Sequence, residues 1–475
     1  MTIASTNAEV TAIDTQARWP LLLMLGGALK WLVVAGVLSL IVSIQLHSPA
    51  FLAEYSVFTH GRAVAMAETA FVYGWAANAG LALALWILGR LGGEPLRALN
   101  WVVVGTYAWN IGVAIGIVGI AIGDATSFSL LQMPGYAQPL MLVGYAAIAV
   151  SGILAWSGRR TDGTFASHWY AIAALFLFPW LFSAAQAMLV WTPVRGVLQA
   201  VAAGWFAQGV WTLWLAPLAL AVAYYVVPKV TGRALSGYDF APHGFWTLIV
   251  IGAWTGGRHL VGGPLPAWVA TLAIVSCTLL LFHTLVVALN LRGAFGGGGT
   301  ALKFIAFGVG AYVFGGLLDA VTAFRSVALV TQFTHFTTAQ QQLALYGGVS
   351  MILFGGIYFA VPRLTGRPWA SAAFVAGHRV TVVLGIVLLV VSLAAAGWIQ
   401  GHDLNNPKIS FADIALHTRP WLLLATAAQL ILLSANLLLL VNFVRSVGAC
   451  CCCGEETAPA EAPFRPAATM EAHAS

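Results

Sequence analysis

The chain has 475 residues, of which 60% are hydrophobic and only 8% are charged. Soluble domains carry about 25% charged residues, so this composition excludes a soluble globular protein and indicates one that crosses a membrane many times. The net charge of +6 does not come from a basic run interleaved with aromatic residues, so nucleic-acid binding is also excluded.

Twelve apolar runs are each long enough to cross a bilayer core of about 30 Å as an α-helix. They do not alternate between apolar and polar residues, which excludes the strands of a membrane barrel. We therefore expect an all-α integral membrane protein, with a twelve-helix domain over 20–446 between an N-terminal tail (1–19) and a C-terminal tail (447–475). The predicted spans are 20–46, 64–89, 100–123, 138–157, 168–192, 200–227, 243–261, 266–291, 302–324, 338–361, 377–399 and 420–444.

Lysine and arginine residues are distributed unevenly outside these spans. Fourteen lie on the side that holds both termini and five lie on the other side, while Lys30 and Arg258 fall within spans. Because positively charged loops tend to stay in the cytoplasm, both termini are predicted to be cytoplasmic. The expected location is the inner (cytoplasmic) membrane, where the lipid bilayer is the first partner.

A run of four cysteines, Cys450, Cys451, Cys452 and Cys453, follows the last span and precedes a segment that is expected to be disordered. Cysteines at a cytoplasmic helix end are candidates for S-acylation. The alternatives are a metal site, which adjacent thiols form poorly, and no defined role. Cys277 stands alone in a span and is expected to be a packing residue.

Eleven histidines occur in the chain, and only His259 and His283 lie well inside predicted spans. Neutral imidazole is a usual ligand of haem and copper. No predicted helix carries a His-x-His or His-His pair, however, and a lone histidine inside a helix is more often a hydrogen-bonded core residue. The sequence favours that core role for both residues and leaves His259 as a weak candidate metal ligand.

Two acids, Glu68 and Asp319, also fall within spans, and they equal in number the two bases within spans, Lys30 and Arg258. Charged groups at that depth are costly, so they are expected to pair with one another or to line a path for protons or substrate. The remaining alternative is that their side chains reach the membrane interface. Equal numbers of acids and bases favour pairing, but the sequence does not indicate which residues meet.

Amide side chains are a second unusual feature of the spans. Gln208 is predicted to face the bundle interior or a pore, because an amide in lipid lacks hydrogen-bond partners. The run Gln340, Gln341 and Gln342 begins the tenth span and is expected to be partly interfacial. Spans six and ten each end in a proline and a base, and Pro228 and Pro362 are expected to stop these helices.

Several short motifs occur in order along the chain. They are Gly61-Arg62, Phe71-Val72-Tyr73-Gly74, Tyr224 to Lys229, Trp254 to Leu260, Tyr358 to Leu364 and Gly397-Trp398-Ile399-Gln400-Gly401. With these motifs, over about spans two to twelve, the chain resembles subunit I of the haem–copper oxidase superfamily. The resemblance is closest to the cbb3-type cytochrome c oxidases, with the nitric oxide reductases as cousins.

The resemblance implies six positions for haem and copper ligands, of which only one is a histidine here. The former haem positions are Ala65 (Ala67 if a two-residue gap is placed differently), Gln340 and Gln342, and the former copper positions are Gln208, Arg258 and His259. The family's redox tyrosine falls on Gly262, whereas Asp319 matches an acid that the family keeps. A guanidinium cannot bind a metal, so the usual binuclear chemistry is not expected.

The expected function is therefore that of a degenerate subunit I-like protein of a respiratory chain. It would act as a non-catalytic or ligand-binding homologue without cofactors, beside a cytochrome c-type or other respiratory membrane subunit. One alternative is an active oxidase or nitric oxide reductase-type subunit whose haem b and copper are held by His60, His243 or His335. The other alternative is a transporter or channel that uses the vacated cofactor cavity.

Overall fold

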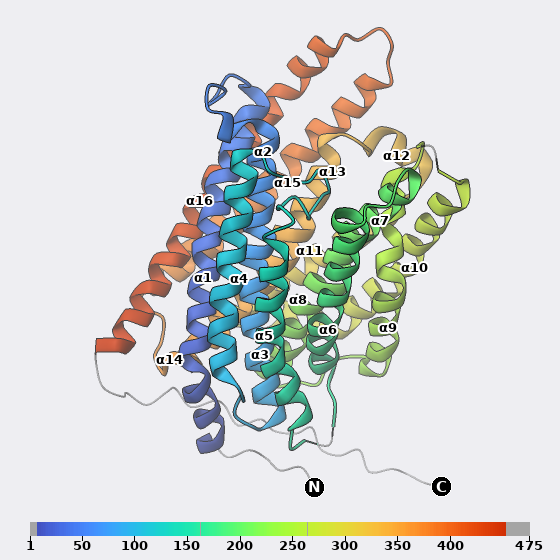
Figure 1. Cartoon of the computed structure of the whole chain (residues 1–475). Helices are drawn as coiled ribbons and strands as arrows, with labels where there is room; N and C mark the ends of the chain where they lie inside the picture. Colours follow the sequence, from blue (N-terminus) through green and yellow to red (C-terminus); the bar gives the residue numbers. More distant parts are fainter. Residues whose placement is uncertain (1–6, 162, 264, 453–475) are drawn as a thin grey trace, which may run out of the picture.

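The structure is a computed structural model that describes residues 7–161, 163–263 and 265–452. Within these residues all regular structure is helical, because a backbone in lipid must satisfy its hydrogen bonds inside its own segment. Eleven of the helical segments in these ranges are long and apolar enough to cross a membrane. They stand side by side in one bundle (Figure 1), which confirms the predicted all-α membrane fold.

The first half of the chain supplies six of these spans. They are α1 (Asn7–His47), α2 (His60–Thr69) with η2 (Ala70–Ala76) and α3 (Ala77–Gly92), α4 (Leu99–Ile122), α5 (Gln138–Ser157), α6 (Ala166–Gln186) with η3 (Ala187–Trp191), and α7 (Val197–Gly209) with η4 (Val210–Leu215) and α8 (Ala216–Thr231). Short 3-10 helices, η1 (Ser56–Phe58) and η5 (Tyr238–Phe240), lie in the connections.

The second half supplies the other five spans. They are α10 (Ala267–Leu291) with η7 (Arg292–Gly296), α11 (Thr300–Thr322), α13 (His335–Gln342) with η8 (Leu343–Ser350) and α14 (Met351–Thr365), α15 (Ala372–Leu404), and α16 (Phe411–Cys452). The short helix α12 (Arg325–Thr331) joins α11 to α13.

The seventh predicted span, 243–261, differs from the expectation of a continuous α-helix. It consists of the 11-residue helix α9 (Ala241–Ile251) and the 3-10 helix η6 (Gly252–Leu260), so it is not among the eleven long spans. Glycine is a poor α-helix former, and Gly252, Gly256 and Gly257 all fall within η6. The seventh predicted span is therefore present, but its second half is wound more tightly than an α-helix.

Three spans form the inside of the bundle. They are the spans formed by α2 to α3, by α7 to α8 and by α13 to α14, which are the second, sixth and tenth of the predicted spans. In these, 100%, 94% and 94% of the most apolar window is buried, against 33–56% in the other eight observed spans. Each of these three spans contains a π-helical segment, namely η2, η4 and η8. Such segments insert an extra residue into a helix and occur frequently at functional sites. The same three spans carry four of the six positions that the resemblance assigns to ligands, and η6 carries the other two.

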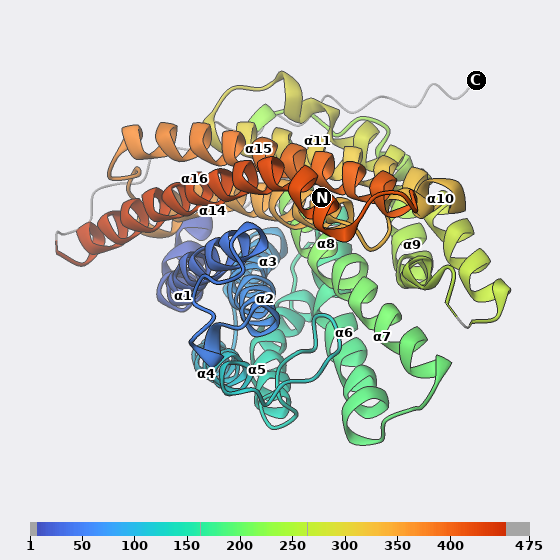
Figure 2. The ribbon, with the colours of Figure 1, turned by 90° about the horizontal axis from the view of Figure 1, so that it is seen from above.

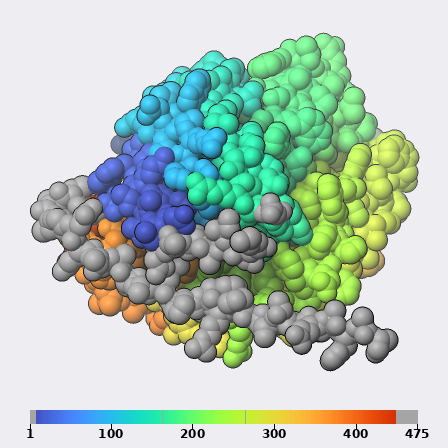
Figure 3. All heavy atoms as spheres, turned by 90° about the horizontal axis from the view of Figure 1, so that it is seen from below, coloured from blue at the N-terminus to red at the C-terminus, as the bar shows by residue number. Residues whose placement is uncertain are grey.

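The two terminal helices are longer than predicted. Residues 7–19 belong to α1 and residues 447–452 belong to α16, so the tails expected there are partly helical; Cys453 lies outside the described residues. The start of α1 and the end of α16 lie at the same end of the bundle (Figure 1). At that end the blue start of α1 lies beside the light-blue and teal segments (Figure 3), and Gln16 donates a 2.7 Å hydrogen bond to the carbonyl of Leu96.

The two prolines do not stop their helices where the sequence suggested. α8 continues past Pro228 to Thr231, and α14 continues past Pro362 to Thr365. Each helix ends instead at a glycine in the left-handed conformation, Gly232 (φ 65°) and Gly366 (φ 70°). A glycine just after the last turn is a common helix terminator, because it adopts this conformation without steric cost.

Candidate functional site

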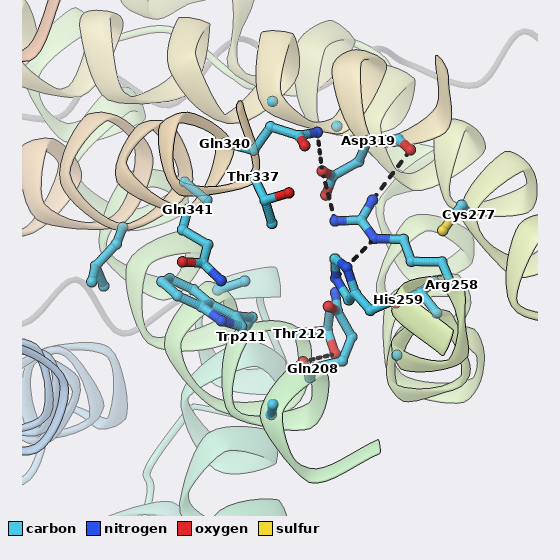
Figure 4. Close-up of a pocket in the computed structure, with 18 of the residues that line it drawn as sticks. Gln208, Trp211, Thr212, Arg258, His259, Cys277, Asp319, Thr337, Gln340 and Gln341 are labelled. Carbon is cyan, nitrogen blue, oxygen red and sulfur yellow. Dashed lines mark hydrogen bonds and ion pairs between the residues drawn. The ribbon is translucent and has the colours of Figure 1, made fainter. Parts of the chain in front are cut away.

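Most of the site positions predicted from the sequence line one cavity of about 530 Å³. Residues of α2, α7, η6, α10, α11 and α13 contribute to its wall, and Figure 4 shows Gln208, Trp211, Arg258, Asp319 and Gln340 among those around its open centre. The predicted residues among them are Glu68, Gln208, Arg258, His259, Asp319, Gln340, Gln341 and Gln342. The fold thus brings together the predicted copper positions and two of the predicted haem positions.

Close packing of η6 against α7 and η4 fixes the polar side of this cavity. A Cβ atom on Gly256 would lie 2.2 Å from the carbonyl oxygen of Gly204, so only glycine allows this approach. At the start of η6, a Cβ atom on Gly252 would lie 2.8 Å from the Cβ of Thr212. At its end, Gln332 donates a 2.6 Å hydrogen bond to the carbonyl of His259. These contacts hold Arg258 and His259 in place.

Arg258 forms an ion pair with Asp319 at the centre of the site (Figure 4). Its Nη2 atom lies 3.0 Å from Oδ1 of Asp319, and its Nη1 atom donates to the Asp319 backbone carbonyl at 3.2 Å. The Arg258 side chain is only 12% exposed, so its charge needs a counter-ion. The structure therefore pairs this base with Asp319, one of the two acids considered from the sequence.

The amide of Gln340 extends the same network. Its Nε2 atom donates to Oδ1 of Asp319 at 3.2 Å and to the hydroxyl of Thr322 at 2.8 Å. The neutral amide of Gln340 adds no charge, but it donates a second hydrogen bond to the carboxylate oxygen that Arg258 also contacts. Gln340 and Arg258, both at former ligand positions, are thus tied to the same acid.

The residues at the former copper positions do not fit a three-imidazole copper site. Arg258 is a permanent cation without a lone pair to donate to a metal. The Arg258 Nε atom donates to Nε2 of His259 at 3.3 Å, which uses the lone pair that this imidazole nitrogen would need for a metal. Nowhere in the described ranges do three or more His, Cys, Asp or Glu residues gather as a metal-binding group.

The former haem positions do not fit a pair of axial histidines either. Ala65 and Ala67 are 8% and 7% exposed and have no donor atom at all. Gln340 is hydrogen-bonded to Asp319 and Thr322, and the amide of Gln342, which also lines the cavity, is a weak haem ligand. The imidazole nitrogens that would bind copper or haem iron in the family that this chain resembles are therefore replaced at five of the six positions.

The other acid and base within spans do not pair. The carboxylate of Glu68 accepts a 2.5 Å hydrogen bond from Gln132, a residue of the connection between α4 and α5 that the sequence did not single out. Lys30 is exposed on the outside of α1, where its ammonium lies 4.6 Å from the centre of the Trp31 ring. Of the pairs considered, only the one between Arg258 and Asp319 forms.

The histidines inside the bundle include one, His378, that lies further into its helix than the sequence predicts. His283 is a hydrogen-bonded core residue as predicted, with Nδ1 2.8 Å from the Gly244 carbonyl and Nε2 2.9 Å from the Tyr312 hydroxyl. His168 lies in the first turn of α6, at a helix end as predicted, and is 1% exposed. His378 is also predicted at a helix end, but it lies in the second turn of α15 and is 0% exposed. The predicted span 377–399 starts too late there, because α15 begins at Ala372.

The histidines considered as reserve ligands stay at helix starts. His60 begins α2, His335 begins α13, and His243 lies in the first turn of α9. None of the three lines the cavity of the Arg258–Asp319 pair. Cys277 does line it, and this buried thiol therefore faces the site, which its isolated place in the sequence did not indicate.

A second, more open hollow of about 630 Å³ adjoins the cavity. Ala200, His259 and Leu260 line both spaces. The outer wall of the hollow includes Gly196 before α7 and Phe333 before α13, whose side chain is 82% exposed. His259 and Leu260 thus stand between the cavity and the surface.

Known proteins resemble this chain over most of its length. A family model described as Cytochrome C and Quinol oxidase polypeptide I matches residues 20–431. Cytochrome c oxidase subunit 1 of Rhodobacter capsulatus is 23% identical over 395 residues, which cover 78% of this chain and 72% of that protein. Cbb3-type cytochrome c oxidase subunit CcoN1 of Stutzerimonas stutzeri is 22% identical over 438 residues, which cover 88% of this chain and 92% of that protein.

A solved structure supports the same fold. A chain from the cryo-EM structure of a heme-copper terminal oxidase dimer superposes with a TM-score of 0.69 at 15% identity, covering 98% of this chain and 88% of that one. Similarity at that level of identity shows the fold, while the family match extends over most of the sequence. The chain therefore belongs to the Cytochrome C and Quinol oxidase polypeptide I family, the haem–copper oxidase subunit I family that includes the cbb3-type enzymes.

Proposed function

We propose that this chain is a non-catalytic member of its family, in which a polar network replaces the metal-bound cofactors. The observation that carries the proposal is the ion pair between Arg258 and Asp319 at the former copper position. A fixed guanidinium charge in that place repels a copper ion, and its counter-ion is already supplied by the protein. The pair therefore favours a cavity without copper.

The same chemistry supports the absence of haem iron ligation. Binding of haem through the former positions requires imidazoles where the chain has alanine and glutamine. Family members bind haem and copper, and this chain keeps their fold while five of its six corresponding side chains differ in donor chemistry. The proposal is that the fold is retained for its role as a membrane subunit.

We place this role in a respiratory assembly of the inner (cytoplasmic) membrane, with both termini in the cytoplasm. Subunit I of the haem–copper oxidases works within a complex of several membrane subunits, which is the basis for this proposal. A cytochrome c-type or other respiratory subunit is the partner expected.

Spectroscopy of the purified protein tests the proposal directly. The chain is extracted from its native membranes in mild detergent, and its absorption spectrum and metal content are measured. We expect no Soret band and no stoichiometric copper. Haem or copper bound at one equivalent per chain would overturn the proposal and support the active oxidoreductase, with ligands other than those at the aligned positions.

A gain-of-ligand variant provides the matched control. The double substitution Gln208→His and Arg258→His places three imidazoles at the former copper positions, together with His259. We expect this variant to bind copper more tightly than the unchanged chain when both are dialysed against the same copper concentration. Equal binding by the two proteins would mean that these positions do not control copper affinity.

The adjoining hollow favours a second candidate function, namely binding or transport of a small molecule through the cavity. Its motivation is that Ala200, His259 and Leu260 line both spaces. In a chain with Cys450–Cys453 replaced by serine, a small thiol reagent should reach Cys277 through the hollow. A Leu260→Trp substitution should slow this reaction, and an unchanged rate would exclude the hollow as the route.

A further inference from the structure

A lysine lies near the middle of the bilayer on the outer surface of the bundle. Lys30 follows Arg18 by twelve residues, which corresponds to about 18 Å along α1. Its neighbour Trp31 donates a 2.7 Å hydrogen bond to Asn110, and Asn110 stands midway along the 24-residue helix α4. Both measures place Lys30 at the centre of the membrane rather than at an interface.

The surroundings of Lys30 are apolar. On the same face of α1, Trp19 is 52% exposed and Val37 is 44% exposed, and on neighbouring α4 the side chains of Tyr107 and Ile111 are 56% and 51% exposed. Figure 2 shows α1 at the rim of the bundle between α4 and α16. We call this surface, formed by Trp19, Lys30 and Val37 of α1 with Tyr107 and Ile111 of α4, the Lys30 face.

Lipid alone is an unfavourable environment for this ammonium group. A lysine at the centre of a membrane helix costs about 2.5–3.5 kcal/mol on insertion scales. Snorkelling offsets such a cost near helix ends, but a lysine stem of roughly 6 Å does not reach an interface about 18 Å away. Across the described ranges, no carboxylate lies within ion-pair distance of Lys30, and its contact is the Trp31 ring.

A second copy of this chain does not supply the missing charge. Three acids lie in the described spans at least three residues from a span end, and each has a partner within the bundle: Asp14 with Trp86, Glu68 with Gln132 and Asp319 with Arg258. A two-fold symmetric pairing through the Lys30 face would also bring two lysines together. A counter-charge at this depth therefore has to come from a different protein.

We propose that the Lys30 face binds a transmembrane helix of another membrane protein, and that this helix carries an aspartate or glutamate at mid-bilayer depth. Pairing with a carboxylate removes the cost of an isolated charge in lipid, and the flanking Trp19, Val37 and Ile111 provide apolar contact area. The inference rests on the position of Lys30 and holds whether or not the cavity binds cofactors.

Site-specific photo-crosslinking in native membranes tests the proposal. A photoreactive amino acid replaces Val37, which lies two helical turns from Lys30 on the same face. We expect one adduct with a membrane-spanning segment that contains a central Asp or Glu. The control site is Leu279, a residue of α10 that is 50% exposed and should give only lipid adducts. Figure 2 shows α10 on the opposite side of the bundle from α1.

Substitutions of Lys30 then distinguish charge pairing from simple proximity. Lys30→Gln should lower the adduct yield roughly tenfold, whereas Lys30→Arg should retain it. Lys30→Asp should abolish the adduct, and exchange of the partner's acid for lysine should restore it. If the aspartate variant fails to insert, the comparison of the Gln and Arg variants decides.

Four outcomes would overturn the proposal. They are adducts with lipid only, an adduct with a second copy of this chain, an adduct with a segment that lacks a membrane carboxylate, and a yield that is unchanged in Lys30→Gln. Gel-filtration profiles of every variant check that the bundle remains folded, so a loss of adduct is not mistaken for unfolding.

Discussion

The Arg258 side chain is 12% exposed and its partner Asp319 is 40% exposed, so the pair stands at the wall of the cavity rather than in a dry core. Burial of Arg258 makes its charge expensive without a counter-ion, while the cavity side of Asp319 remains accessible to polar groups. The ion pair consequently holds η6 and α11 together through one charged contact. The contribution of the pair to the stability of the fold depends on whether one partner or both are removed.

Removal of one partner is predicted to destabilise the protein more than removal of both. Asp319→Asn leaves Arg258 without its counter-ion, at a cost of at most ~3–5 kcal/mol for a fully buried pair and less here because Asp319 is partly exposed. The double change Arg258→Met with Asp319→Leu removes both charges and should recover much of this loss. Thermal unfolding in detergent, followed by fluorescence-detected gel filtration, measures both effects.

The control for this prediction is Arg325→Gln. Arg325 is another arginine near the same end of α11, but its contact is an exposed 3.2 Å hydrogen bond to Thr271. An exposed pair of this kind contributes little to stability, so the melting temperature should change far less. If the double variant is as unstable as the sum of its single changes, Arg258 and Asp319 are not energetically coupled.

At the scale of single elements, hydropathy predicted where helices occur but not their form. The apolar run at 243–261 predicts a span, but the second half of that span is a 3-10 helix. In this helix Gly256 approaches the backbone of Gly204 so closely that a side chain would not fit. Hydropathy does not contain that contact, which joins residues 52 positions apart. The same limit explains the late predicted start of α15, which left the buried His378 at a helix end.

Side-chain partners were the least predictable part of the site. The number of acids and bases showed that pairing was favourable, but the choice of Asp319 for Arg258 depends on how η6 and α11 each pack against α10. Glu68 found its partner in Gln132, a residue outside every predicted span. The cavity positions were predictable because they follow the motif order of the family, whereas its hydrogen bonds depend on distances that a linear sequence does not contain.

On the scale of the whole molecule, the orientation in the membrane follows from the loops. The first residues of α1 and the last residues of α16 lie at one end of the bundle (Figure 1), so these two helix ends are on the same side of the membrane. Fourteen basic residues outside the spans were assigned to this side and five to the other. The positive-inside tendency therefore favours cytoplasmic termini.

Reporter fusions test this orientation. Green fluorescent protein fused after Ser475 should fluoresce, because it folds in the cytoplasm and not after export in unfolded form. Alkaline phosphatase inserted after Arg195, in the connection between η3 and α7, should be active, and the same enzyme inserted after Arg233, between α8 and α9, should be inactive. The two insertion sites lie one span apart, so they must report opposite sides. A dark C-terminal fusion together with activity only at Arg233 would invert the orientation and would place the cavity's adjoining hollow on the cytoplasmic side.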